Sequence, residues 1–298
     1  MKKINIQILI LYFLLLTLGQ VLPQAQAQTK TQLQAQGKIV FTKNREIHII
    51  EPNGKNLAQL TDYEVPGHRP ISLSSSVSKA GQIGYIYDPV NHGYMSTYKM
   101  NLNGSNKIRV SKEPSSNNSS TWGSTISPDG KYFVFQSTIS NNIEIYRMNS
   151  DGSNVINISH TLRDDYFPKW SPDSNKIIFS TSNSSGGTDI VTTDINGNNK
   201  TLLIQSDRKL INVAISKDGR KIAYSDSKSN SSDLWIADID GRNANKIKTV
   251  NKWTNLSFSP DSQQITFVSV TGKISIIDID GSGYKELTKG VRPVWTFN

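Results

Sequence analysis

Basic, acidic and aromatic side chains gather in the segments that separate the apolar runs of this sequence. Histidine exchanges protons near neutral pH, arginine binds carboxylates and phosphates, and tryptophan and tyrosine offer large contact surfaces. Together these residue types favour recognition of an acidic protein segment, a peptide or a glycan. The candidate binding residues are His68, Arg69, His160, Arg163, Asp164, Asp165, Tyr166, Arg208, Lys209, Trp253 and Arg292.

Catalytic motifs are thin in this sequence. It contains neither Gly-x-Ser-x-Gly nor His-Glu-x-x-His, which argues against an attached hydrolase or metalloprotease domain. The four histidines are scattered at positions 48, 68, 92 and 160. His68 and His160 could share a metal with Asp164 or Asp165, but two separate histidines on a rim are the simpler account. We therefore expect a non-enzymatic protein with no metal and no cofactor.

Two turn motifs recur along the chain and define an internal repeat. The first reads Ser-Pro-Asp-Gly, as at 127–130, and the second ends in Asp-Gly, as at 151–152. Proline presets φ for the second turn position and glycine accepts positive φ, so both motifs favour tight turns. The glycine of the second motif recurs at intervals of 40 to 50 residues, at Gly54, Gly104, Gly152, Gly197, Gly241 and Gly281.

The apolar runs between these turns predict four short strands in each repeat. A period of this length with four strands is typical of a β-propeller blade. The first unit, from Gly37, lacks an inner strand, whereas residues 292–297 supply one at the other end of the chain. We therefore predict an all-β, six-bladed propeller with four antiparallel strands per blade. Its C-terminal strand closes the ring by completing blade one, which protects the open edge.

The strand order assigns each loop to one of two faces. Both turn motifs lie on one face, here named the turn face. The loops between second and third strands and the connections between blades lie on the other, the variable-loop face, where repetitive scaffolds usually bind. The connections carry the candidate residues and are predicted at 62–69, 112–121, 160–167, 206–211, 251–255 and 289–292.

Other aromatic and acidic residues are expected to have structural rather than binding roles. Trp122, Trp170 and Trp295 lie on predicted inner strands, where we expect their rings to fill space between blades. The segment Asp238–Asn243 resembles the first half of an EF-hand loop. Calcium binding there would also need a bidentate glutamate and flanking helices. The hairpin context favours a turn.

The N-terminal residues have the features of a secretory signal peptide. Lys2 and Lys3 precede an apolar run over 4–22, and Ala25–Ala27 matches an A-x-A cleavage site. We expect residues 1–27 to be the signal peptide, 28–36 a polar leader and 37–298 the propeller. An uncleaved membrane anchor is the alternative. Loss of the two lysines lowers the formal net charge from +9 to +7. With no cysteine, an exported chain depends on its core rather than on disulfides.

The Ser-Pro-Asp-Gly turn, the segment Ile145–Asn154 and a closing Leu-Thr pair, as in Leu60-Thr61, resemble the repeat of TolB-type propellers. The resemblance extends over 37–298 and implies a six-bladed propeller of the bacterial envelope. TolB also carries an N-terminal α/β domain, for which residues 28–36 leave no room, so we expect a propeller-only relative. The same repeat occurs in propeller domains of prolyl-oligopeptidase-like peptidases and in some sugar lyases.

These observations predict a periplasmic or secreted bacterial protein that binds an envelope protein or peptide through its variable-loop face. The positive charge favours an acidic partner, and an exported chain is not expected to meet nucleic acid. We expect a monomer without a stable membrane span once the signal is cleaved. The alternative is a lyase or hydrolase acting on an anionic sugar or peptide in the central funnel, through His68, His160, Arg163 and Asp165.

Overall fold

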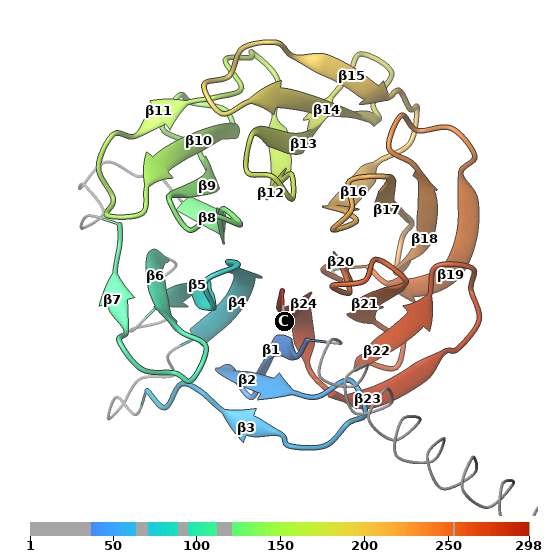
Figure 1. The fold of residues 1–298 in the computed structure, drawn as a ribbon. Coiled ribbons are helices and arrows are strands. Elements are labelled where there is room, and N and C mark those ends of the chain that lie inside the picture. The colour runs from blue at the N-terminus through green and yellow to red at the C-terminus, as the bar shows by residue number, and fades with distance from the viewer. Residues whose placement is uncertain (1–36, 64–70, 89–94, 112–120, 253, 298) are drawn as a thin grey trace, which may run out of the picture.

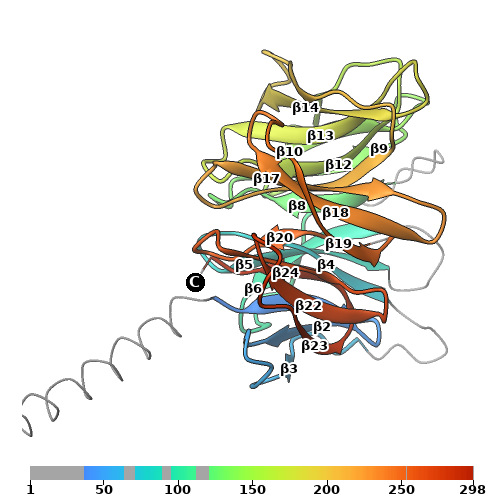
Figure 2. The ribbon, with the colours of Figure 1, turned by 90° about the vertical axis from the view of Figure 1, so that its right-hand side faces the viewer.

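Twenty-four short strands make up the computed structural model, which describes residues 37–63, 71–88, 95–111, 121–252 and 254–297 (Figure 1). They form six antiparallel four-stranded sheets, arranged as blades around a central axis. The side view in Figure 2 shows a ring whose strands run between two faces. Among the described residues, no helix has the length and hydropathy needed to cross a bilayer. The predicted six-bladed, all-β propeller is confirmed.

Each blade orders its strands from the inner to the outer edge. Blade one holds β24 (Val291–Trp295), β1 (Ile39–Lys43), β2 (Glu46–Ile50) and β3 (Ala58–Gln59). Blade two holds β4 (Ile71–Val77), β5 (Gln82–Asp88), β6 (Ser96–Asn101) and β7 (Ile108–Arg109). Blade three holds β8 (Thr121–Ile126), β9 (Tyr132–Ser137), β10 (Glu144–Asn149) and β11 (Ile156–Asn157).

The second half of the ring repeats this order. Blade four holds β12 (Asp165–Trp170), β13 (Lys176–Ser182), β14 (Thr188–Asp194) and β15 (Thr201–Ile204). Blade five holds β16 (Leu210–Ile215), β17 (Lys221–Ser227), β18 (Ser231–Asp238) and β19 (Asn245–Asn251). Blade six holds β20 (Ser257–Phe258), β21 (Gln264–Val268), β22 (Lys273–Asp278) and β23 (Lys285–Lys289).

The Ser-Pro-Asp-Gly turns share one hydrogen-bond pattern. In blade three the Ser127 hydroxyl donates to Asp129 at 2.6 Å and accepts from the backbone amide of Tyr132 at 3.0 Å. Gly130 has a φ of 75°, in the left-handed region that glycine adopts without strain. The serine–aspartate bond recurs in the next three blades, at Ser171, Ser216 and Ser259. Turn formation therefore accounts for this motif.

The Asp-Gly turns lie beside the first turns on the same face, as predicted. In blade three the backbone amide of Ser150 donates to the carbonyl of Lys131 at 2.8 Å, which joins the two turns. Gly152 has a φ of 84°, and a Cβ at this position would overlap the carbonyl oxygen of Val110 in the preceding blade. Two constraints therefore require glycine at position 152: the positive φ of its backbone and the close approach of the Val110 carbonyl.

The EF-hand-like segment Asp238–Asn243 forms one of these turns. Asp238 accepts from Lys221 Nζ at 2.7 Å and from Asn243 Nδ2 at 2.6 Å. The carboxylate of Asp240 accepts from the Arg242 guanidinium at 2.7 Å. These carboxylates serve the hairpin and its neighbours. Within the described residues, no group of three or more His, Asp or Glu is placed to hold a metal ion.

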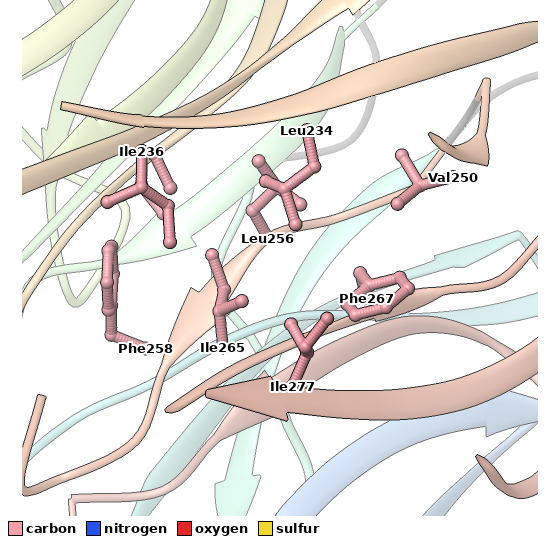
Figure 3. Packing of buried hydrophobic residues seen from close by; sticks show 10 residues of the cluster. Leu234, Ile236, Val250, Leu256, Phe258, Ile265, Phe267 and Ile277 are labelled. Atoms are coloured by element: carbon pink, nitrogen blue, oxygen red, sulfur yellow. The ribbon is translucent and has the colours of Figure 1, made fainter. Parts of the chain in front are cut away.

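Apolar clusters between neighbouring blades form the core. Figure 3 shows the cluster between blades five and six, where Leu234 and Ile236 of β18 pack against Ile265 and Phe267 of β21. None of these four side chains is more than 5% exposed. Burial of a side chain of this size contributes about 1.5–3 kcal/mol. Five further clusters join the other neighbouring blades, so blade-to-blade packing holds the ring together.

The inner strand of blade four begins earlier than the sequence predicted. Asp165, Tyr166 and Phe167 were assigned to a connection but belong to β12. The pairing of β12 with β13 shifts register between Tyr166 and Lys169, and Phe167 has a φ of 56°. This is a β-bulge, whose extra residue interrupts the alternation of side chains that identifies a strand. Arg292, predicted both to end a connection and to begin the closing strand, has a φ of 55° and belongs to β24.

The C-terminal strand closes the ring, as predicted. β24 pairs antiparallel with β1 and places Trp295 opposite Ile39. Beyond it, the backbone amide of Thr296 donates to the carbonyl of Lys38, and the Lys38 amide donates to the Thr296 hydroxyl, each at 2.8 Å. Trp295 is completely buried. The first and last described segments of the chain therefore share one blade.

Deletion of residues 292–298 should unfold or aggregate the protein, because it leaves the inner edge of β1 without a partner strand and empties the space that Trp295 fills. We expect the melting temperature to fall by at least about 10 °C, since truncation of a buried tryptophan alone costs about 3–5 kcal/mol. Thermal melting and size-exclusion chromatography measure this outcome. Removal of residues 28–36 is the control for truncation as such. A C-terminally truncated protein with an unchanged melting temperature would refute ring closure by β24.

Candidate functional site

The six inner strands surround a central channel along the axis of the ring. A cavity of about 90 Å³ occupies its half nearer the turn face and is lined from every blade. A second cavity, of about 110 Å³, occupies the half nearer the variable-loop face. Lys169 lines both cavities and so lies where the two halves meet. Both cavities are smaller than the roughly 300–1,000 Å³ of pockets that hold drug-sized ligands.

Residues at one equivalent position of the repeat line the 110 Å³ cavity. The residue four positions before the turn serine, or before Thr296 in blade one, lines this cavity in five of the six blades. These equivalent residues are Gly123, Phe167, Asn212, Asn255 and Arg292. Arg292 is the one with a charge. A bulge re-aims a side chain, and here it brings the arginine to the axis.

A second set of equivalent residues lies one step deeper in the channel. At the position two residues before the turn serine, or before Thr296, the six blades carry Ser76, Thr125, Lys169, Ala214, Ser257 and Val294. Five of the six are small or medium-sized and neutral. Lys169 alone is long and charged, and nothing in the repeat geometry requires it.

The channel contains partly buried cations whose pKa values are lowered. Burial, with a smaller contribution from the positive charge of Arg292, lowers the pKa of Lys169 to about 8. Burial also lowers the pKa of Arg292. Towards the turn face, burial and then the charge of Lys79 lower the pKa of Lys217 to about 8. The Lys217 ammonium lies 3.7 Å from the centre of the Phe297 ring, a cation–π contact.

The segment 160–166 carries five of the predicted binding residues and lies on the variable-loop face. Asn142, in the loop between β9 and β10, donates to the carbonyls of Thr161 at 3.2 Å and Arg163 at 2.9 Å, which joins the two loops. Asp164 accepts from the backbone amide of Ile143 at 2.9 Å and from the Tyr166 hydroxyl at 3.0 Å. The predicted neighbourhood of these loops is confirmed.

The five residues do not share one environment. His160 and Arg163 are exposed, whereas Asp165 is completely buried. Asp165 accepts from the Thr161 hydroxyl at 2.8 Å, and its burial raises its pKa. Burial also raises the pKa of Tyr166. Asp165 therefore supports the loop from below and does not present its carboxylate on the face.

Arg208 and Lys209 lie apart from these residues, in the connection between blades four and five. Arg208 is exposed and its guanidinium pairs with Asp226 at 3.1 Å. With Tyr224 and Trp235 these two residues line an open groove of about 510 Å³. Lys209 is exposed beside it. The structure therefore brings the candidates together on one face but distributes them over several blades.

Three predicted residues, His68, Arg69 and Trp253, lie outside the described residues. The enzymatic alternative names four residues, of which His68 lies outside the described residues. The other three, His160, Arg163 and Asp165, do not line the central cavities. The described part of that alternative does not converge on the axis.

Sequence reasoning missed Lys169, Lys217 and Trp122 as channel residues. Trp122 was expected to fill space between blades, but it is half-buried and lines the 110 Å³ cavity. Trp170 and Trp295 are buried as expected, at 8% and 0% exposure. Alignment of the six repeats on the turn serine would have singled out Lys169, because its equivalents are neutral.

Replacement of Asp165 by Asn should raise the melting temperature at pH 7. The folded pKa of Asp165 lies above its unfolded value, so the folded state holds the proton more tightly and stability falls as pH rises through this window. The gain should disappear below about pH 4, where the carboxyl is protonated in both states. Thermal melts at pH 3.5 and pH 7 test this. Asp164→Asn, which loses an acceptor for the Tyr166 hydroxyl, should lower the melting temperature; equal effects of the two changes at both pH values would contradict the assignment.

Comparison with known proteins gives relatives of low identity and a shared fold. No protein-family model matches the chain. The Tol-Pal system protein TolB of Anaeromyxobacter dehalogenans is 22% identical over 179 residues, which are 56% of this chain and 41% of that protein. This chain thus spans about two fifths of the length of that curated relative.

Solved structures extend the likeness over most of the ring. TolB from Acinetobacter baumannii matches with a TM-score of 0.71 at 22% identity, over 87% of this chain and 66% of that chain. A puromycin hydrolase matches with a TM-score of 0.57 at 14% identity, over 85% of this chain and 43% of that chain. With TolB among its relatives in both sequence and structure, this six-bladed chain fits the TolB-type β-propeller family.

Proposed function

We propose that this protein is an exported interaction module of the bacterial envelope that binds a protein or peptide through its variable-loop face. The TolB-like relatives suggest an envelope interaction module. The basic start and apolar run over 1–27 support export through a signal peptide. The proposed propeller covers 37–298.

The observation that carries the proposal is the placement of exposed apolar side chains. The three most exposed large hydrophobic residues of the described chain are Leu162 at 101%, Val270 at 62% and Ile139 at 55%. All three lie in loops of the variable-loop face, in a blade connection or between second and third strands. Exposed apolar residues gathered on one face of a soluble scaffold favour a protein contact.

The chemistry of the surrounding residues supports an acidic partner. Exposed Arg163 lies next to Leu162, and exposed Arg208 and Lys209 lie in the following connection. Apolar residues with flanking cations suit a peptide or protein segment that combines apolar and acidic side chains. The formal net charge, +7 once Lys2 and Lys3 are lost with the signal peptide, would also draw such a partner from a distance.

A pull-down from envelope extract tests this proposal with two matched triple variants. The face variant carries Leu162→Ser, Arg163→Glu and Lys209→Glu. The control carries the same changes elsewhere, Leu202→Ser on the outer strand β15 with Lys131→Glu and Arg220→Glu on the turn face; all six residues are exposed.

We expect the wild type and the control to recover the same partner and the face variant to lose at least about nine tenths of it, because interface cations and apolar anchors are replaced together. Quantitative mass spectrometry of the eluates measures recovery, and thermal melting shows that both variants fold. Full recovery by the face variant, or equal loss in both variants, would overturn the choice of face.

A further inference from the structure

We propose that the central channel binds an oxyanion, the carboxylate or phosphate group of a ligand, between Lys169 and Arg292. This site is separate from the proposed interaction face, and its existence does not depend on that function. The argument rests on the internal repeat, on the charges in the channel and on the size of the cavity.

The repeat provides a control for Lys169 within the same chain. Five equivalent inner-strand residues, Ser76, Thr125, Ala214, Ser257 and Val294, build the same wall without a charge. The scaffold therefore closes around neutral residues, and the ammonium of Lys169 is not needed for folding. A cation held in a narrow channel loses part of its hydration shell, and this costs free energy unless an anion or a hydrogen-bond acceptor compensates for it. Such a costly group at one of six equivalent positions indicates a function.

The charge in the channel has one sign. Arg292 lines the same 110 Å³ cavity as Lys169, and no Asp or Glu is among the described residues that line either cavity. Lys169 makes no side-chain hydrogen bond or ion pair with any described residue. Lys217 lines the other cavity, so positive potential continues towards the turn face. A narrow channel with low-dielectric walls focuses this field on its axis.

The remaining lining residues suit an anion. The amides of Asn212 and Asn255 and the indole of Trp122 line the cavity and bring N–H donors to it. One amide is partly engaged, because Asn212 Nδ2 donates to Ser225 at 3.3 Å. The cavity volume of about 110 Å³ is well below the roughly 300–1,000 Å³ of pockets that hold drug-sized ligands, and it suits a single carboxylate or phosphate group.

Anion binding in the channel should depend on the protonation of Lys169. Its pKa of about 8 means that it is mostly charged at pH 7 and mostly neutral at pH 9.5. Arg292 is the charged group that acts on this pKa, and the other described residues lining the 110 Å³ cavity are neutral. Lys217, which lines the 90 Å³ cavity together with Lys169 and has a pKa of about 8, loses its charge over the same pH range. Anion affinity should therefore fall as pH rises from 7 to 9.5, because the neutral amine no longer attracts the anion.

The experiment titrates the full chain with three probes at constant ionic strength: inorganic phosphate, acetate and an N-acetylated tetraglutamate amide. Isothermal titration calorimetry gives the affinity, and tryptophan fluorescence follows Trp122. Saturable binding of phosphate or acetate supports a free small ion as the ligand. Binding of the peptide alone supports a carboxylate carried by a partner chain.

Two variants that use the repeat's own residues keep the test interpretable. Lys169→Thr copies Thr125 and Arg292→Asn copies Asn212, so both should fold. We expect each to lower the affinity of the bound probe at least tenfold at pH 7. Lys169→Thr should also weaken the loss of affinity between pH 7 and 9.5, of which the titration of Lys217 leaves a part. Lys131→Thr, on the turn face, removes the same charge and should change the affinity less than twofold. Absence of saturable binding by all three probes, or unchanged affinity in Lys169→Thr, would overturn the proposal.

Discussion

The pairing of β24 with β1 determines where every other element of this protein lies. It joins the two ends of the described chain into one blade, through Trp295 opposite Ile39 and the reciprocal bonds between Thr296 and Lys38. A closed ring leaves no inner or lateral blade face exposed, so each sheet packs on two neighbours. Closure also converts six inner strands into the wall of a single channel. Without it the bulges would direct their side chains into open solvent rather than towards one another.

The two faces of the ring differ because one is held by the repeat and the other is not. On the turn face the backbone amides of Asp129 and Asp218 donate to the hydroxyls of Ser174 and Ser262 in the next blade, at 3.0 and 3.1 Å. A change in turn length there would break contacts on both sides. The described loops of the variable-loop face differ in length and carry exposed residues such as Leu162. The repeated bonds between blades therefore lie on the face opposite to the one proposed for recognition.

The sequence predicted the features that depend on local chemistry and on counting. The turn at Ser127 is encoded by neighbouring residues, and closure followed because blade one lacked an inner strand. The bulges were missed, since an extra residue such as Phe167 interrupts the alternation on which strand prediction depends. Their omission placed Asp165 in a loop, although its side chain is completely buried. Whether a side chain points to the axis or to a neighbouring blade depends on the register beyond the bulge, which composition does not reveal.

The proposed anion site in the channel would need no architecture beyond that of the repeat. In a ring of equivalent blades, one substitution in one inner strand reaches the axis, where it faces all the others. Lys169 and Arg292 come from blades four and one, on distant parts of the chain, yet they line one cavity. A substitution in one of the six copies is tolerated because the five neutral copies still build the wall of the channel. A difference between copies at one structural position is therefore more informative about function than the conserved turn motifs that identify the fold.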